Sequence, residues 1–214
     1  MLAGKKVVVV GGSSGIGLST AELAKREGAD VIVASRNTDR LNAVAEKLGV
    51  KAITADVTSD ESVASLFRSC GPVDHVAVTA AQLRTGPFKT VAMDDVRATM
   101  ESKFWGAWRV ARSAEIRPGG SLTLVSGYLS IRPRLNSAIV GAANGALESL
   151  ARSLALELAP VRVNAVSPGG SSIRRFARPC RKPPAATCSP RRQPACPSAA
   201  SARAKIPRGR SWPS

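Results

Sequence analysis

The residues best suited to chemistry in this chain form a glycine-rich loop near its N-terminus. The loop reads Gly11-Gly12-Ser13-Ser14-Gly15-Ile16-Gly17 and separates a four-valine run, residues 7–10, from an amphipathic helical pattern. Glycine lets a backbone turn sharply and bring bare N–H groups against a pyrophosphate, and the N-terminus of the following helix attracts the phosphates. A tight turn is the alternative interpretation of an isolated glycine string. The position between a strand and a helix favours dinucleotide binding.

The end of the second predicted strand bears on which dinucleotide is bound. A carboxylate at this position binds the ribose 2′-hydroxyl of NAD and repels a 2′-phosphate. The chain instead has Ser35 and Arg36 there, with no acidic residue. An arginine can hold a phosphate through charge-assisted hydrogen bonds, so the sequence favours NADP over NAD. The alternative is that Arg36 is a solvated loop residue.

These residues are positioned by alternating strands and helices. Runs of β-branched residues are typical of strands buried on both faces of a parallel sheet, and the segments between them have helical periodicity. The pattern predicts an α/β fold with a doubly wound parallel sheet of the Rossmann type, joined by right-handed crossovers. Six strands are expected, over residues 7–10, 31–34, 51–54, 74–79, 121–126 and 161–166. Helices are expected over residues 15–27, 38–48, 60–68, 93–114 and 137–158.

Length and composition are those of a globular protein. The 214 residues are enough for one domain with a buried core, and the chain is 44% hydrophobic and 21% charged. No apolar run approaches the ~20 residues that a transmembrane helix needs, and the N-terminal valine run is too short for a signal peptide. We therefore expect a cytoplasmic protein that does not enter a membrane.

The net charge of +16 is concentrated in a C-terminal tail. Residues 169–214 contain 11 Lys and Arg and no acidic residue, so residues 1–168 carry 20 basic and 15 acidic residues. A Pro- and Arg-rich segment without hydrophobic periodicity cannot bury enough apolar area to offset the entropy of folding. We therefore predict one folded nucleotide-binding domain over residues 1–169 and a disordered tail over residues 170–214.

The chain resembles the short-chain dehydrogenase/reductase family over about residues 3–170. The resemblance rests on the glycine loop, on Ala55-Asp56-Val57-Thr58 after the third strand, and on Arg162-Val163-Asn164-Ala165-Val166-Ser167-Pro168-Gly169. It implies an oxidoreductase in which Asp56 contacts the adenine end of the cofactor and the last segment lies beside the nicotinamide. The cofactor-binding residues expected on these grounds are Gly11, Ser13, Ser14, Gly15, Ile16, Gly17, Ser35, Arg36, Asp56, Val57, Ala80, Ala81, Asn144, Pro168 and Gly169.

The positions that carry catalysis in this family are changed here. The alignment places Val140 at the catalytic tyrosine, Asn144 at the lysine four residues later, and Gly127 at the serine, with Ser126 adjacent. Lys103 stands at the position of a structural asparagine. Valine cannot exchange a proton, and the loss of a general acid typically lowers the rate by about 10²–10⁴. Hydride transfer is therefore expected to be weakened.

Neighbouring residues offer a substitute for the missing groups. Tyr128, the single tyrosine of the chain, follows the fifth predicted strand together with Ser126 and Ser130, and Lys103 could supply a cation. Ser126, Tyr128 and Asn144 are therefore the candidate catalytic residues. The alternative, which the sequence favours, is that Tyr128 packs on the rim of the site and Lys103 is a surface lysine.

The tail has two interpretations. A shift of the reading frame can turn residues 195–214 into a Pro-x-Gly-Arg-x-Gly segment followed by Glu-Asp, which resembles the family's segment before its last helix. We interpret the tail as such an out-of-frame product, in which the family's seventh strand is missing and the domain is truncated. The rival interpretation is a basic arm for nucleic acid or for an acidic surface. Cys180, Cys188 and Cys196 have neither zinc-site spacing nor the even number of a disulfide set, so no metal site is predicted.

The leading hypothesis is an NADP-dependent oxidoreductase, impaired here, that acts on an unidentified carbonyl or alcohol. The alternatives are a non-catalytic NADP-binding protein such as a sensor, and the product of a broken gene. The resemblance also implies a homodimer through the helices at about residues 93–115 and 137–158. We expect a small-molecule substrate and neither a nucleic-acid nor a membrane partner.

Overall fold

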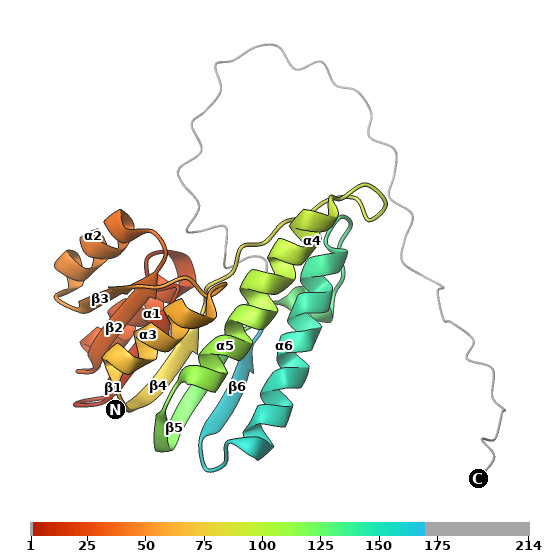
Figure 1. Ribbon diagram of the computed structural model, residues 1–214. Helices are drawn as coiled ribbons and strands as arrows, with labels where there is room; N and C mark the ends of the chain where they lie inside the picture. The colour runs from red at the N-terminus through yellow and green to blue at the C-terminus, as the bar shows by residue number, and fades with distance from the viewer. Residues whose placement is uncertain (1, 170–214) are drawn as a thin grey trace, which may run out of the picture. The chain divides into compact units, whose positions relative to one another are not determined.

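The chain folds around one parallel sheet in the part that its structure, a computed structural model, describes, which is residues 2–169. Six strands pair in the order β3-β2-β1-β4-β5-β6 (Figure 1), which confirms the predicted doubly wound α/β fold. The predicted disorder of residues 170–214, their shifted frame and the missing seventh strand concern the chain outside the described residues. The strands are β1 (Lys6–Val10), β2 (Asp30–Ser35), β3 (Lys51–Thr54), β4 (Val73–Val78), β5 (Ile116–Val125) and β6 (Arg162–Val166).

The two faces of the sheet are covered by different helices because side chains alternate along each strand. Val7 and Val9 are buried among residues of α1 and α2, whereas Val8 and Val10 are buried among residues of α3, α5 and α6. Figure 1 shows α3, α5 and α6 side by side on the second face. No helix of residues 2–169 is both long enough and apolar enough to cross a membrane. The helices are α1 (Gly15–Arg26), α2 (Thr38–Leu48), α3 (Asp60–Cys70), α4 (Met93–Met100), α5 (Gly106–Ser113) and α6 (Ala138–Glu157).

The stretch predicted as one helix over residues 93–114 is interrupted. Between α4 and α5 the chain makes a π-helical turn, η1 (Glu101–Trp105). A π-turn accommodates one extra residue in a helix, and such turns are frequent at functional sites. Periodicity did not reveal it because the turn carries a polar residue, Lys103, toward the core, where apolar residues are expected.

The fifth strand is longer than predicted. β5 begins at Ile116 and not at Ser121, because Ile116 pairs with Val73 ahead of an irregularity in the β4–β5 register between Val73 and His75. Gly119 and Gly120, just before the predicted start of the strand, therefore lie inside it.

Candidate functional site

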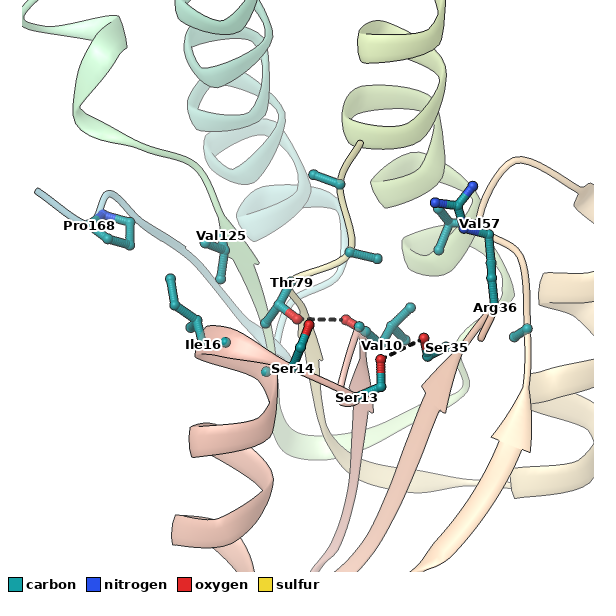
Figure 2. Close-up of a pocket in the computed structure, with 16 residues that line it drawn as sticks. Val10, Ser13, Ser14, Ile16, Ser35, Arg36, Val57, Thr79, Val125 and Pro168 are labelled. Carbon is teal, nitrogen blue, oxygen red and sulfur yellow. Dashed lines mark hydrogen bonds between the residues drawn. The ribbon is translucent and has the colours of Figure 1, made fainter. Parts of the chain in front are cut away.

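A pocket of about 540 Å³ lies at the carboxyl ends of the central strands. In open α/β sheets this is the crevice where ligands bind, at the point where the strand order reverses. Figure 2 shows Ile16, Val125 and Pro168 toward one end of the pocket and Arg36 and Val57 toward the other. The predicted cofactor-binding residues that line it are Gly11, Ser13, Ser14, Gly15, Ile16, Gly17, Ser35, Arg36, Val57, Ala80, Ala81 and Pro168.

Three other predicted cofactor-binding residues are not part of the lining. The carboxylate of Asp56 accepts hydrogen bonds from the backbone N–H and the hydroxyl of Thr58, each at 2.9 Å. Asn144 is almost fully buried in α6. Gly169 follows the lining residue Pro168 in the chain. The structure therefore gathers the glycine loop, the end of β2 and the end of β4, and leaves these three outside.

Four residues that were not among the predicted cofactor-binding residues also line the pocket. They are Val10, Ala55, Thr79 and Val125. Val10 and Val125 are the last residues of β1 and β5. The rule that ligands bind at the carboxyl ends of parallel strands could have found these two.

The glycine loop packs tightly against the end of β4. Gly11 has a φ of +92°, and a Cβ built on it would lie 2.5 Å from the backbone nitrogen of Ala80. A Cβ on Gly17 would collide with the carbonyl oxygen of Gly11. At Gly15, in contrast, an added Cβ would meet nothing within 4 Å, because this glycine opens onto the pocket. The loop therefore forms a closely packed turn with an open cradle at Gly15.

The N-terminus of α1 is prepared for an anion. Its N-cap residue, Ser14, makes no side-chain capping hydrogen bond, and the first turn contains no acidic residue. The first turns of α2 and α3 differ, since Asn37 and Ser59 cap their N–H groups and acidic side chains are present. The uncapped N–H groups and the helix dipole of α1 fit the pyrophosphate of a dinucleotide.

The end of β2 supplies the polar groups at the other end of the pocket. The hydroxyl of Ser13 donates to the hydroxyl of Ser35 at 2.8 Å. Arg36 is exposed, and its Nη1 donates to Oε1 of Gln82 at 3.3 Å. Among the ion pairs of residues 2–169, none includes Arg36. Its positive charge is therefore available to an anionic ligand.

The three candidate catalytic residues do not line the pocket, although Ser126 contacts the backbone of Asn144. The hydroxyl of Ser126 donates to Oε1 of Glu148 at 2.8 Å and lies 3.1 Å from the backbone carbonyl oxygen of Asn144. The hydroxyl of Tyr128 accepts from Arg134 at 3.1 Å, on the exposed side of the short 3₁₀ turn η2 (Tyr128–Ser130). Asn144 donates from Nδ2 to the carbonyl oxygen of Gly127 at 3.0 Å.

Glu148 joins the loops that follow β5 and β6, a role that no feature of the sequence predicted. Its Oε1 accepts hydrogen bonds from the hydroxyls of Ser130 at 2.7 Å, Ser126 at 2.8 Å and Ser167 at 3.0 Å. These bonds, the one from Ser130 foremost, lower the pKa of the Glu148 carboxyl. Glu148 is therefore an ionised acceptor at neutral pH and a poor proton donor.

Lys103 is not the surface residue that the sequence favoured. It is 5% exposed, and its Nζ donates to the carbonyl oxygens of Val125 at 3.1 Å and Ser126 at 3.2 Å. Burial lowers the pKa of the Lys103 amine to about 8. Just after β4, the backbone N–H groups of Thr79 and Ala80 both donate to the carbonyl oxygen of Val10 in β1. The carbonyl oxygen of Val125, a residue that lines the pocket, accepts from Lys103.

The positions predicted to replace the family's tyrosine and lysine hold no acid–base group. Val140 and Asn144 are 3% and 1% exposed, and neither lines the pocket. Asn144 Oδ1 has no hydrogen-bond partner within residues 2–169. The site thus has a well-formed place for a dinucleotide and, among the described residues that line it, no side chain suited to proton transfer to a carbonyl.

Known proteins share this architecture and sequence. A family model described as enoyl-(acyl carrier protein) reductase matches residues 10–186. The chain is 31% identical over 200 residues to a short-chain dehydrogenase/reductase of Stachybotrys chlorohalonatus, covering 83% of this chain and 78% of that protein. It is 33% identical over 179 residues to L-xylulose reductase of Mesocricetus auratus, covering 78% and 72%. The crystal structure of a short-chain dehydrogenase from Mycobacterium smegmatis superposes with a TM-score of 0.76 at 28% identity, covering 80% and 78%.

Proposed function

Since the chain belongs to the short-chain dehydrogenase/reductase family, we propose that it binds NADP in the pocket at the carboxyl ends of β1, β2, β4 and β5. Membership implies an oxidoreductase that uses NAD or NADP. We further propose that the substrate is a carbonyl compound or an alcohol and that hydride transfer is weak in this chain.

The choice of NADP rests on the position and the uncompensated positive charge of Arg36. This residue follows β2, lines the pocket and forms no ion pair with any described carboxylate. A guanidinium in this state attracts a 2′-phosphate, whereas a carboxylate at the same place would repel it. The end of β2 offers a ribose no carboxylate to bind, which disfavours NAD.

The remaining contacts fit the rest of the nucleotide. The uncapped N-terminus of α1 and the open cradle at Gly15 would hold the pyrophosphate. Ile16, Val125 and Pro168 form an apolar wall that would exclude water from the nicotinamide end. A bound nicotinamide would supply or accept the hydride. The protein would bind and orient it, but Val140 provides no proton for the reacting oxygen.

A second candidate function, a non-catalytic NADP-binding protein, is supported by the replacement of the acid–base residues. Asn144 donates a hydrogen bond to Gly127, and Glu148 accepts hydrogen bonds from the hydroxyls of Ser126 and Ser130. These contacts hold the region as a fixed structural network. Such a protein would bind the nucleotide without turning over a substrate.

Titration with NADPH and NADH tests the choice of cofactor. We expect NADPH to bind more tightly, and Arg36→Ala to reduce the difference by roughly 1.5–3 kcal/mol, the range for a hydrogen bond to a charged group. Arg40→Ala, on the exposed first turn of α2, is the matched control and should leave the difference unchanged. Equal affinities in the unmutated protein would refute the proposal.

Turnover distinguishes the two candidate functions. NADPH oxidation is followed against a panel of carbonyl compounds, with binding of the nucleotide measured in the same samples. Slow but substrate-dependent oxidation supports the impaired oxidoreductase. Tight binding without oxidation of NADPH by any compound supports the non-catalytic protein.

A further inference from the structure

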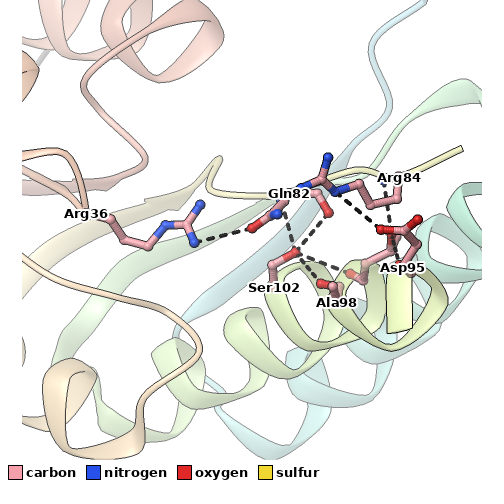
Figure 3. Close-up of polar contacts among 7 residues, drawn as sticks. Arg36, Gln82, Arg84, Asp95, Ala98 and Ser102 are labelled. Carbon is pink, nitrogen blue, oxygen red and sulfur yellow. Dashed lines mark hydrogen bonds and ion pairs between the residues drawn. The ribbon is translucent and has the colours of Figure 1, made fainter. Parts of the chain in front are cut away.

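Arg36 is held from across the pocket. Its Nη1 donates to Oε1 of Gln82 at 3.3 Å (Figure 3). Arg36 follows β2 and Gln82 follows β4, and β1 lies between these two strands in the sheet. The hydrogen bond therefore spans the carboxyl end of β1, where the pocket is.

The backbone of Gln82 is fixed by the helix behind it. Its N–H donates to the hydroxyl of Ser102 in η1 at 2.9 Å, and Ser102, which is buried, donates in turn to the carbonyl of Ala98 at 2.9 Å. Two residues on, the N–H of Arg84 donates to the buried hydroxyl of Thr99 at 3.0 Å. Two buried hydroxyls thus anchor the loop, and the side-chain amide of Gln82 remains directed at Arg36 (Figure 3).

The chemistry of the amide determines what this contact does. A guanidinium has five N–H donors, so one bond to Gln82 leaves four for a ligand. The amide oxygen is neutral and leaves the positive charge of Arg36 uncancelled, which a carboxylate at the same place would not. Restricting a long side chain before binding also removes part of the entropy lost when a ligand orders it.

We propose that Gln82 is a positioning residue for cofactor specificity, which holds the Arg36 guanidinium over the pocket so that its free N–H groups meet a 2′-phosphate. This inference rests on the proposed binding of NADP. The preference for NADP over NAD then depends on two residues from different loops. Arg36 alone would lose more rotamer entropy on binding, because it is a long and exposed side chain.

Two probes isolate the effect, adenosine 2′,5′-bisphosphate and adenosine 5′-monophosphate, which differ by the 2′-phosphate. Their dissociation constants are measured by calorimetry with the full chain, and their ratio is the selectivity. Gln82→Met keeps the length and apolar volume of the side chain but removes the acceptor. It should lower the selectivity by about three- to tenfold, the loss expected when one long side chain is no longer pre-ordered.

Gln82→Glu is the sharper variant because it changes one atom and introduces a charge. It should lower the selectivity further than Gln82→Met, since the carboxylate pairs with Arg36 and repels the phosphate. In an Arg36→Ala background, Gln82→Met should leave the ratio unchanged, which a merely structural role of the loop does not predict. Arg84→Gln is the control on the same loop, because Arg84 pairs with Asp95 at 3.7 Å and not with Arg36.

The outcomes separate the two levels of the proposal. If neither probe binds the unmutated protein, the proposal that it binds NADP is refuted, and the proposed role of Gln82 is refuted as well. If the bisphosphate is preferred but Gln82→Met leaves or raises the selectivity, NADP binding stands and the positioning role is refuted. A fall in selectivity that Arg84→Gln also produces would likewise refute it, because the effect would then belong to the loop as a whole.

Discussion

The side-chain amide of Asn144 donates a hydrogen bond to the backbone carbonyl of Gly127 at 3.0 Å, and this contact joins α6 to the loop after β5. A Cβ built on Gly127 would lie 2.8 Å from Asn144 Nδ2. Gly127 and Asn144, which we predicted to stand at the positions of the family's catalytic serine and lysine, therefore fit each other, the glycine leaving room for the amide.

Gly127→Ser should destabilise the fold because the new side chain overlaps the Asn144 amide. We expect a loss of about 1–3 kcal/mol in the free energy of unfolding, as for other overpacked sites, measured by chemical denaturation. Asn144→Ala combined with Gly127→Ser should recover part of this loss, so that the double-mutant cycle gives a coupling of about 0.5–3 kcal/mol. Additive effects would show that the two positions do not depend on each other.

Restoring the proton-transfer residues should raise activity. The triple variant Gly127→Ser, Val140→Tyr and Asn144→Lys should reduce carbonyl compounds faster than the unmutated protein, as the return of a general acid implies. The rate of NADPH oxidation is the measurement. The Asn144→Lys single variant is the control, and it should show no gain because it supplies no proton donor at residue 140.

The sequence predicted the strands well because the buried β-branched runs carry a strong and local signal. The strand over residues 51–54 and the helix over residues 38–48 were predicted with the bounds that the structure has. The π-turn at Lys103 and the register shift before His75 escaped prediction, because both depend on contacts between segments far apart in the chain. The glycine loop and Arg36 could be proposed from the sequence for the same reason as the strands, since their chemistry follows from neighbours in sequence. The contact between Gln82 and Arg36 could not be predicted, because it joins two segments that are far apart in the chain.

Burial of Lys103 should make stability depend on pH. Its pKa is lowered to about 8 by burial, so between pH 8 and 10.5 the unfolded chain holds a proton that the folded protein has released. Stability contributed by this group therefore rises with pH in that window, by roughly 3 kcal/mol in all. Lys103→Met should abolish the rise.

The measurement is the free energy of unfolding at pH 7 and pH 10.5 for the unmutated protein and the variant. Lys89→Met, at an exposed lysine in the loop before α4, is the control and should retain the rise. If the unmutated protein and Lys103→Met change in parallel, the amine titrates normally and its burial does not affect the fold.

The aromatic residues of η1 and α5 should lie in the proposed homodimer interface. Trp105 and Trp108 are 45% and 44% exposed, and their ring centroids lie 6.1 Å apart. Exposed aromatic residues of this kind are enriched at interfaces. Light scattering should give the mass of a dimer, and Trp105→Ser with Trp108→Ser should give a monomer. Leu23→Ser, at a similarly exposed residue of α1, should remain dimeric. A monomer before mutation would exclude the interface.

The packing of the glycine loop determines which of its glycines would persist if nucleotide binding were lost in evolution. A descendant that stopped using a nucleotide would still need Gly11 and Gly17, because a larger residue at Gly11 would strike the backbone of Ala80 and one at Gly17 would strike the backbone of Gly11. Gly15 is not restrained in this way, since its Cβ would enter open space and its φ of +55° is one that asparagine also adopts. After loss of ligand binding, we therefore expect Gly15 to be substituted first. Gly11 and Gly17 would persist even in a protein that no longer bound a nucleotide.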